Sequence, residues 1–273
     1  MPELPEVETI KRSLAPRLLG RRILEISVRL PRMVEGVDPE ELRRRLSGQV
    51  IGGLDRRGKH LLLELAAGDR LAFHLRMTGR LLLRPAGHPE EPHTHLVFLL
   101  SEGWELRYAD LRKFGRLHYL PAGDPLPAPL ADLGPEPLED GFTPAVLEGI
   151  LAGRRGPIKA VLLDQRSVAG IGNIYADEIL HRARLHPARP AGSLSSAEIA
   201  RLHAAIRAVL EEAILSRGTT SRDYVDGEGR PGEYQERLLV YGRAGGACPS
   251  CGAEIRRMVL AGRGTHYCPI CQA

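Results

Sequence analysis

Four cysteines near the carboxyl end of the chain have the spacing of a metal site. They form the pattern Cys248-x2-Cys251-x16-Cys268-x2-Cys271, and the 273-residue sequence contains no others. Two thiolates separated by two residues can hold one ion, and a hairpin between the pairs would bring all four sulfurs together. Four thiolates suit tetrahedral zinc and leave no coordination position for a substrate, so we predict one structural Zn²⁺. A redox CxxC pair is the alternative, but it would be expected beside a βαβ pattern, which this region lacks.

The amino terminus carries a second group of residues that could do chemistry. Removal of Met1 would make Pro2 a secondary amine, which can form an iminium with an aldehyde carbon. Glu3 and Glu6 are one helical turn apart, so they could supply a proton donor beside that amine. The alternative is that these residues only cap a helix, as Pro and Glu at a helix start usually do. The chain has only four other amine side chains, which are Lys11, Lys59, Lys113 and Lys159.

The charge distribution favours a polyanionic partner. Residues 121–141 contain five carboxylates and no Lys or Arg, so the net charge of +4 rises to +9 when that stretch is left out. A basic body of this kind suits nucleic acid, and the alternative is a solvated surface rich in arginine. No apolar run approaches the ~18 residues of a membrane span. The amino terminus lacks a secretory pattern, so we predict a cytoplasmic protein with no membrane partner.

Short apolar runs before residue 121 predict a β-sandwich or barrel. These runs lie at residues 59–65, 71–77, 81–84, 96–100, 104–108 and 116–120. Apolar residues at helical spacing predict one helix over residues 4–18 ahead of the strands. Six prolines within residues 121–141 predict a linker. After the linker, the sequence predicts helices at residues 143–151, 157–163, 174–181 and 196–216, and short strands around the cysteines from residue 236.

Several motifs follow one another in an order that is typical of one family. They are Pro2–Thr9, Gly58–His60, His74–Gly79, Asp110–Gly115, Gly170–Ala176 and the four-cysteine tail. With these motifs the whole sequence resembles the bacterial formamidopyrimidine-DNA glycosylases. The resemblance implies an α+β fold with three domains. These are an N-terminal β-sandwich with flanking helices (residues 1–130), a helix–two-turns–helix domain (131–235) and a C-terminal zinc-finger β-hairpin (236–273).

The resemblance implies a base-excision repair enzyme that acts on double-stranded DNA. Such an enzyme removes oxidised purines, chiefly 8-oxoguanine and formamidopyrimidines, and then cleaves the abasic site by β- and δ-elimination. Pro2 matches the family's Schiff-base nucleophile, Glu3 matches the acid that opens the sugar ring, and Glu6 matches a further active-site carboxylate. Lys59 matches the lysine assigned to β-elimination, and Arg263 matches the arginine assigned to δ-elimination. We also expect the enzyme to be a monomer.

The resemblance further implies a set of DNA contacts. Met77, Arg112 and Phe114 match the side chains that fill the gap left by an extruded nucleotide. Without the resemblance, Met77 and Phe114 would be assigned to the hydrophobic core. The segment 218–235 resembles the loop that covers the extruded base. The remaining matches are expected to hold phosphates, and they are His93, Arg154, Lys159 and Asn173.

Two other functions are consistent with parts of the sequence. One is an endonuclease VIII-like glycosylase for oxidised pyrimidines, which would share the architecture. Leu4, Met77 and the Arg112–Phe114 pair favour the purine enzyme over it. The other is a non-enzymatic zinc-ribbon protein that binds DNA. That function explains the basic body and the cysteines, but it gives no reason for Pro2 and Lys59.

Overall fold

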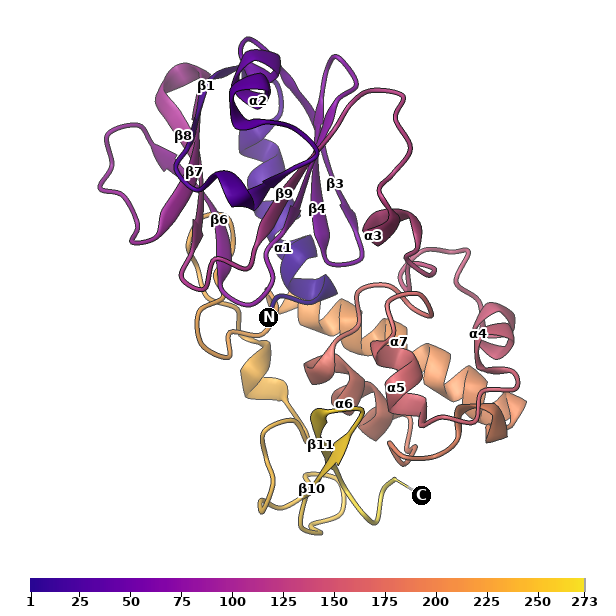
Figure 1. Cartoon of the computed structure of the whole chain (residues 1–273). Coiled ribbons are helices and arrows are strands. Elements are labelled where there is room, and N and C mark those ends of the chain that lie inside the picture. The colour runs from indigo at the N-terminus through magenta and orange to yellow at the C-terminus, as the bar shows by residue number, and fades with distance from the viewer. Residues whose placement is uncertain (273) are drawn as a thin grey trace. The chain divides into compact units, whose positions relative to one another are not determined.

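The computed structural model describes residues 1–272. By its contacts the chain divides into two compact units, whose elements are shown in Figure 1. The first unit contains Met1–Ala131 and Ser216–Glu233, and the second contains Asp132–Leu215 and the chain from Tyr234 onward. The segment Ser216–Glu233 therefore packs with the first unit, although it follows a long helix of the second.

The first unit is built on nine strands. They are β1 (Ile23–Val28), β2 (Val34–Glu35), β3 (Ile51–Arg57), β4 (His60–Leu65), β5 (Arg70–His74), β6 (Gly79–Pro85), β7 (Thr94–Leu100), β8 (Trp104–Asp110) and β9 (Arg116–Leu120). One sheet has the order β1-β7-β8-β6, and the other has the order β2-β9-β5-β4-β3. Apolar side chains from both sheets share one core, in which the Phe73 ring lies edge-on to Phe98 and Tyr108 at about 6 Å. The predicted β-sandwich is confirmed.

Helices cover parts of this sandwich. Helix α1 (Leu4–Leu18) packs against β3 and β4, and α2 (Pro39–Leu46) packs against β1. Shorter helical turns lie at Pro31–Met33, Ser101–Gly103 and α3 (Ala128–Ala131). The apolar residues whose spacing predicted α1 all have no exposed surface, and they are Leu4, Val7, Ile10, Leu14 and Leu18. Their burial explains why the helical period of the sequence was a reliable signal here.

The sequence predictions missed β1, β3 and α2. Strand β3 has the sequence IGGLDRR, in which glycines and charged residues hide the alternation that marks a strand. Helix α2 buries only Leu42 and Leu46 among eight mostly charged residues, so its apolar stripe is too thin to recognise. Asp38 accepts a hydrogen bond from the amide of Glu40 and caps this helix.

One predicted strand was too long. We predicted a strand over residues 71–77, whereas β5 ends at His74. Arg76 adopts a left-handed conformation with φ of 54°, and the amide of Gly79 donates to the carbonyl of Leu75. These features close a turn between β5 and β6. Met77 therefore lies in a turn and not on a strand, which changes what its side chain can reach.

The second unit combines helices with a β-hairpin. Its elements are α4 (Pro144–Leu151), α5 (Ile158–Leu163), α6 (Asn173–Arg182), α7 (Ser196–Leu215), β10 (Arg256–Leu260), β11 (Arg263–Tyr267) and short turns at Ala191–Ser193 and Tyr234–Arg237. Helix α6 packs against α5, α7 and β11. The four predicted helices agree closely with these bounds. No helix within residues 1–272 is both long and apolar enough to cross a membrane.

Candidate functional site

The start of helix α1 holds the amino-terminal residues in a buried setting. Pro2 is buried, and only 3% of Glu3 and 1% of Glu6 are exposed. The amide of Glu3 donates to Oε2 of Glu6 at 2.7 Å, so Glu6 satisfies a backbone donor that the helix leaves unpaired. Glu6 therefore completes a capping box with Glu3, the residue that follows Pro2.

The segment Ser216–Glu233 also contacts Glu6. The amide of Thr219 donates to Oε1 of Glu6 at 2.8 Å, and the hydroxyl of Tyr224 donates to the Glu6 carbonyl at 3.3 Å. Burial, followed by the charge of Glu6, raises the pKa of Tyr224, so its hydroxyl remains a donor. Gly218 has φ of 77°, and a Cβ there would lie 2.8 Å from Oε1 of Glu6. This close approach requires a glycine.

Lys59 lies in the turn between β3 and β4, with 7% of its surface exposed. Arg56 ties this turn to α1, because its Nε lies 3.2 Å from Oε2 of Glu8 and its NH1 donates to the carbonyl of Gly58. Burial alone would raise the pKa of Glu8, but hydrogen bonding from Arg12 and the nearby cations lower it. Glu8 is therefore a stable anion that links the turn carrying Lys59 to the helix that follows Pro2.

Three exposed side chains form a second group in the first unit, which we call the insertion group: Met77, Arg112 and Phe114. Met77 is 46% exposed and Phe114 is 49% exposed. NH1 of Arg112 lies 2.8 Å from the Met77 sulfur, and its guanidinium carbon lies 4.8 Å from the centre of the Phe114 ring. The core assignment, which residue type alone would give Met77 and Phe114, is wrong because about half of each side chain is exposed.

A buried carboxylate shapes the loop that carries Arg112 and Phe114. Asp110 is 1% exposed, and its two oxygens accept from the amides of Arg112 at 3.2 Å and Gly115 at 2.8 Å. Thr78 donates its hydroxyl to Asp110 at 2.5 Å and accepts from the Arg112 amide. The two loops of the insertion group are therefore joined through Asp110 and Thr78, which positions their exposed side chains together.

A hollow of about 540 Å³ lies beside the insertion group. The rings of His60 and His74 meet edge-on at 4.5 Å, and Nε2 of His118 lies 2.9 Å from Glu35. Burial lowers the pKa of His60 to about 4 and that of His74 to about 2, so both imidazoles are neutral at physiological pH. Histidine and arginine side chains line the hollow together with Met77, Phe114 and Pro129, and they include Arg76 and Arg116.

His93 and Arg154 are both exposed, but in different units. His93 adopts a left-handed backbone conformation with φ of 63° just before β7. It lines a hollow of about 260 Å³ with Arg80 and Asp223, among others. In the second unit, Arg154 donates to the hydroxyl of Ser167 at 3.3 Å. Neither side chain is buried, so both are accessible to a phosphate.

The hairpin tip at Arg263 rests on a buried ion pair. Lys159 has no exposed surface, and its Nζ lies 2.6 Å from Asp177, 2.8 Å from the Thr265 hydroxyl and 3.2 Å from the Gly264 carbonyl. Asp177 also accepts from the amide and ring of His266. Asn173 donates to the same Gly264 carbonyl at 3.0 Å. Arg263 itself is exposed, so the cluster holds the tip and presents the arginine.

The four cysteines converge as their spacing predicted. All four sulfurs lie within 4.8 Å of one another, with Cys251 3.4 Å from Cys268 and Cys248 3.9 Å from Cys271. A tetrahedron with Zn–S bonds of about 2.3 Å has edges of about 3.8 Å, so these positions fit zinc. Nε2 of His181, at the end of α6, lies 3.5 Å from the Cys248 sulfur. The donor set is closed, which makes the site structural.

Comparison with known families covers most of the chain. Residues 1–117 match the formamidopyrimidine-DNA glycosylase N-terminal domain, and residues 133–225 match the H2TH domain of the same enzymes. Residues 245–273 match the zinc finger found in FPG and IleRS. Formamidopyrimidine-DNA glycosylase from Symbiobacterium thermophilum is 53% identical over 274 residues, which cover all of this chain and 89% of that protein. The Moorella thermoacetica enzyme is 55% identical over 94% of each chain.

The chain belongs to the formamidopyrimidine-DNA glycosylase family. Solved structures agree with this assignment. The Lactococcus lactis FPG in complex with DNA that contains an abasic site has a TM-score of 0.92 and 41% identity over 99% of both chains. The FPG of Thermus thermophilus has a TM-score of 0.89 and 46% identity, over 99% of this chain and 98% of that one.

Sequence reasoning missed several side chains that organise this glycosylase. Asp110 lies inside a motif that carried the resemblance, so its position was noted without its role. Asp177 and His181 had no such signal, because only the fold brings them beneath the hairpin. Glu178, which is 2% exposed, accepts from the consecutive amides of Leu239, Val240 and Tyr241. A glutamate on a helix gives no sequence sign of such a contact.

Proposed function

We propose that this glycosylase removes 8-oxoguanine and formamidopyrimidines from double-stranded DNA and then cleaves the abasic site. The observation that carries the proposal is the setting of Pro2, which is buried beside Glu3 at the start of α1. Solved Lactococcus lactis relatives hold DNA with Fapy-dG and DNA with an abasic site. They support both halves of the reaction for this chain.

The first chemical steps use the amino terminus after Met1 has been removed. The Pro2 nitrogen bonds to C1′ of the damaged nucleotide and the glycosidic bond breaks. The base leaves with one proton, which is balanced by the proton that the Pro2 nitrogen loses. Glu3 protonates the sugar ring oxygen as the ring opens, which leaves an iminium between Pro2 and C1′. The capping contact of Glu6 holds Glu3 and Pro2 in place for these steps.

The iminium then supports the two strand cleavages. Loss of a proton from C2′, which we assign to Lys59, breaks the bond between C3′ and its phosphate oxygen. Loss of a proton from C4′ then expels the phosphate at C5′. Arg263 is exposed at the hairpin tip, so it can stabilise the departing phosphate as a charged fork donor.

Extrusion of the damaged nucleotide is assigned to the insertion group. Unstacking a base costs a few kcal/mol, so side chains that fill the gap favour the extruded state. Phe114 can enter between base pairs, Met77 can fill the space, and Arg112 can donate to the orphaned cytosine. Their exposure and mutual contacts support this assignment.

We assign the remaining residues to binding of the DNA backbone, either by direct contact or by positioning the hairpin. We assign direct phosphate contacts to His93, Arg154 and Asn173. Lys159 was expected to make such a contact, but its complete burial favours a role in positioning the tip that carries Arg263. The zinc ion supplies only folding free energy to this hairpin.

We also assign a role to each of the three predicted domains. Residues 1–130 would serve catalysis. Residues 131–235 would bind the DNA backbone, except that Ser216–Glu233, which packs with the first unit, would cover the extruded base. Residues 236–273 would hold the zinc and present Arg263. Because the substrate is chromosomal DNA, we propose that the protein acts in the bacterial cytoplasm, as a monomer.

Borohydride trapping tests the proposed function. The mature protein should form a covalent adduct with a duplex that contains 8-oxoguanine, because borohydride reduces the iminium. Pro2→Gly, or retention of Met1, should prevent the adduct while duplex binding remains. A protein that gives no adduct would instead be a zinc-containing DNA-binding protein. Faster excision of thymine glycol than of 8-oxoguanine would assign the chain to oxidised pyrimidines.

A further inference from the structure

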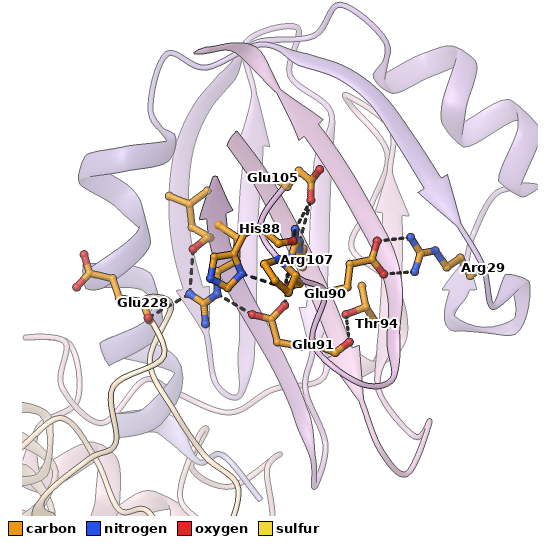
Figure 2. A network of polar contacts seen from close by, with 11 residues as sticks. Arg29, His88, Glu90, Glu91, Thr94, Glu105, Arg107 and Glu228 are labelled. Carbon is orange, nitrogen blue, oxygen red and sulfur yellow. Dashed lines mark hydrogen bonds and ion pairs between the residues drawn. The ribbon is translucent and has the colours of Figure 1, made fainter. Parts of the chain in front are cut away.

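A network of charged side chains in the first unit has no part in the chemistry described above. Its centre is Arg107 on β8, whose side chain is 1% exposed. Arg107 donates to the carbonyls of His88 and Pro89 at 2.7 and 3.0 Å, and to the carboxylates of Glu105 and Glu91 at 2.8 and 3.2 Å. Figure 2 shows these contacts on the loop that leads to β7. A buried guanidinium with every direction occupied fixes the backbone of the loop at residues 88–91.

Glu91 joins this loop to a second residue, Arg84 on β6. One oxygen of Glu91 accepts from Arg107, and the other accepts from Nε of Arg84 at 2.6 Å. The side chains of Glu91 and Arg84 are each 18% exposed. Burial alone would raise the pKa of Glu91, but the hydrogen bonds from Arg84 and Arg107 hold it lowered. Glu91 is therefore a shared anion between two cations.

Arg84 continues the connection to the segment Ser216–Glu233. Its NH1 donates to the carbonyl of Glu228 at 3.1 Å, and the neighbouring amide of Leu83 donates to the carbonyl of Gly227 at 2.9 Å. The amide of Gly227 in turn donates to the Ser13 hydroxyl on α1. One end of the segment is thus anchored to β6 and α1 through this turn.

The turn at residues 226–230 is itself rigid. Asp226 is 1% exposed, and Oδ1 accepts from the amides of Glu228 and Arg230 at 2.9 Å. Oδ2 accepts from Nε of Arg230 at 3.0 Å. An internally satisfied turn can transmit the position of its anchor to the rest of the segment, whose other end contacts Glu6 through Thr219.

The loop on the other side of Glu91 ends at His93. The Thr94 hydroxyl donates to the Glu91 carbonyl at 2.8 Å, and His93 between them is exposed in its left-handed conformation. His93 and Asp223 face the same hollow of about 260 Å³. Residues of the loop and of the segment therefore line one hollow, and Glu91 and Arg84 link the two.

We propose that Glu91 and Arg84 are positioning residues that set the segment Ser216–Glu233 against the loop bearing His93. This inference rests on the proposed function, since it assigns the segment to the damaged base and the loop to the DNA backbone. Contact of the backbone with the loop then holds the segment in place over the base. Excision of a base depends on this link, whereas cleavage of a site that has already lost its base does not.

The test compares two substrates under single-turnover conditions. Arg84→Gln removes the cation from a partly exposed position, so the protein should still fold. We expect excision of 8-oxoguanine to fall by about tenfold, with strand cleavage at a preformed abasic site changed by less than about twofold. Arg84→Lys, which keeps one donor and the charge, should recover part of the loss. Arg43→Gln is the matched control, because it breaks an exposed ion pair with Glu40 on α2.

A double-mutant cycle shows whether the two residues act as one link. Glu91→Gln should resemble Arg84→Gln, and the double variant should be no worse than either single variant. Equal losses on both substrates, together with a lower melting temperature, would show a merely structural role and overturn the proposal. Unchanged excision in Arg84→Gln would also overturn it. Failure of the wild-type protein to excise 8-oxoguanine would instead refute the proposed function.

Discussion

The insertion group of the first unit and the Lys159–Asp177 pair of the second both support predicted DNA contacts, but they differ in exposure. Met77 and Phe114 are about half exposed, whereas Lys159 and Asp177 have no exposed surface. The insertion group is held from behind by Asp110, which leaves its side chains open to a ligand. The buried pair is the support itself, and the residue it presents is Arg263.

This difference shows that a residue matching one of the family's DNA contacts can contribute to DNA binding in two ways. An exposed side chain can contact the ligand, and its removal should change binding with little effect on stability. A buried charge acts through the backbone that it holds, and its removal should cost stability first. Burial therefore separates Lys159 from the exposed Arg154, although the family resemblance assigned both residues to phosphates.

Removal of zinc should have the largest effect on stability, and the loss of structure should be confined to the hairpin. Structural zinc contributes about 10 kcal/mol to the folding of small domains, so chelation should disorder the hairpin that presents Arg263. Duplex binding, measured by fluorescence anisotropy, should then be lost, while circular dichroism should show that the sandwich persists. Full duplex binding by a protein shown to be free of zinc would contradict this expectation.

Replacement of Lys159 should have the second-largest effect on stability. Lys159→Ala leaves Asp177 buried without its cation, which should lower the free energy of unfolding by about 3–5 kcal/mol. Urea unfolding of the zinc-loaded full chain measures this loss. The double variant Lys159→Met, Asp177→Asn should recover much of it, since no unpaired charge remains. A loss below about 1 kcal/mol together with abolished DNA binding would instead indicate a direct phosphate contact.

The histidines beside the insertion group should make stability depend on pH. The folded protein keeps His60 and His74 neutral, because burial lowers their pKa to about 4 and about 2. The unfolded chain binds protons below about pH 6.5, so the free energy of unfolding should fall as the pH drops from about 6.5 to 5. Each histidine should contribute a slope of up to about 1.4 kcal/mol per pH unit.

His74→Asn measures this contribution directly. The asparagine oxygen can still accept from the Arg76 amide, which now donates to Nδ1 of His74. Unfolding curves at several pH values should show a shallower slope for the variant, and His88→Asn serves as an exposed control. An unchanged slope in His74→Asn would mean that this imidazole does not carry the pH dependence.

Replacement of Phe114 should change stability least. Phe114→Ala removes a ring that is already 49% exposed, so the free energy of unfolding should change by less than about 0.5 kcal/mol. Excision of 8-oxoguanine should nevertheless fall by about tenfold, because the ring no longer fills the gap in the stack. Leu111→Ala, which is 56% exposed in the same loop, is the matched control. Equal excision by both variants would remove Phe114 from the insertion group.

Local patterns predicted elements wherever a strong period or a fixed spacing existed. The apolar spacing of α1 and the two CxxC pairs are such cases, and both were confirmed. Strand β3 and helix α2 were missed because glycines and charges masked their short apolar faces. The end of β5 was misplaced because the left-handed Arg76, which closes the turn, has no distinctive residue type.

The residues alone determined four cysteines at metal-ligand spacing and a positive net charge, and they predicted an amino terminus capable of iminium chemistry once Met1 is removed. These properties follow from residue type and short-range spacing. The tertiary structure alone decided that Met77 faces solvent, that Lys159 is sealed against Asp177, and that Glu91 joins two distant loops. Solvent exposure and ion pairing depend on which remote segments pack over a side chain, and no local pattern encodes that.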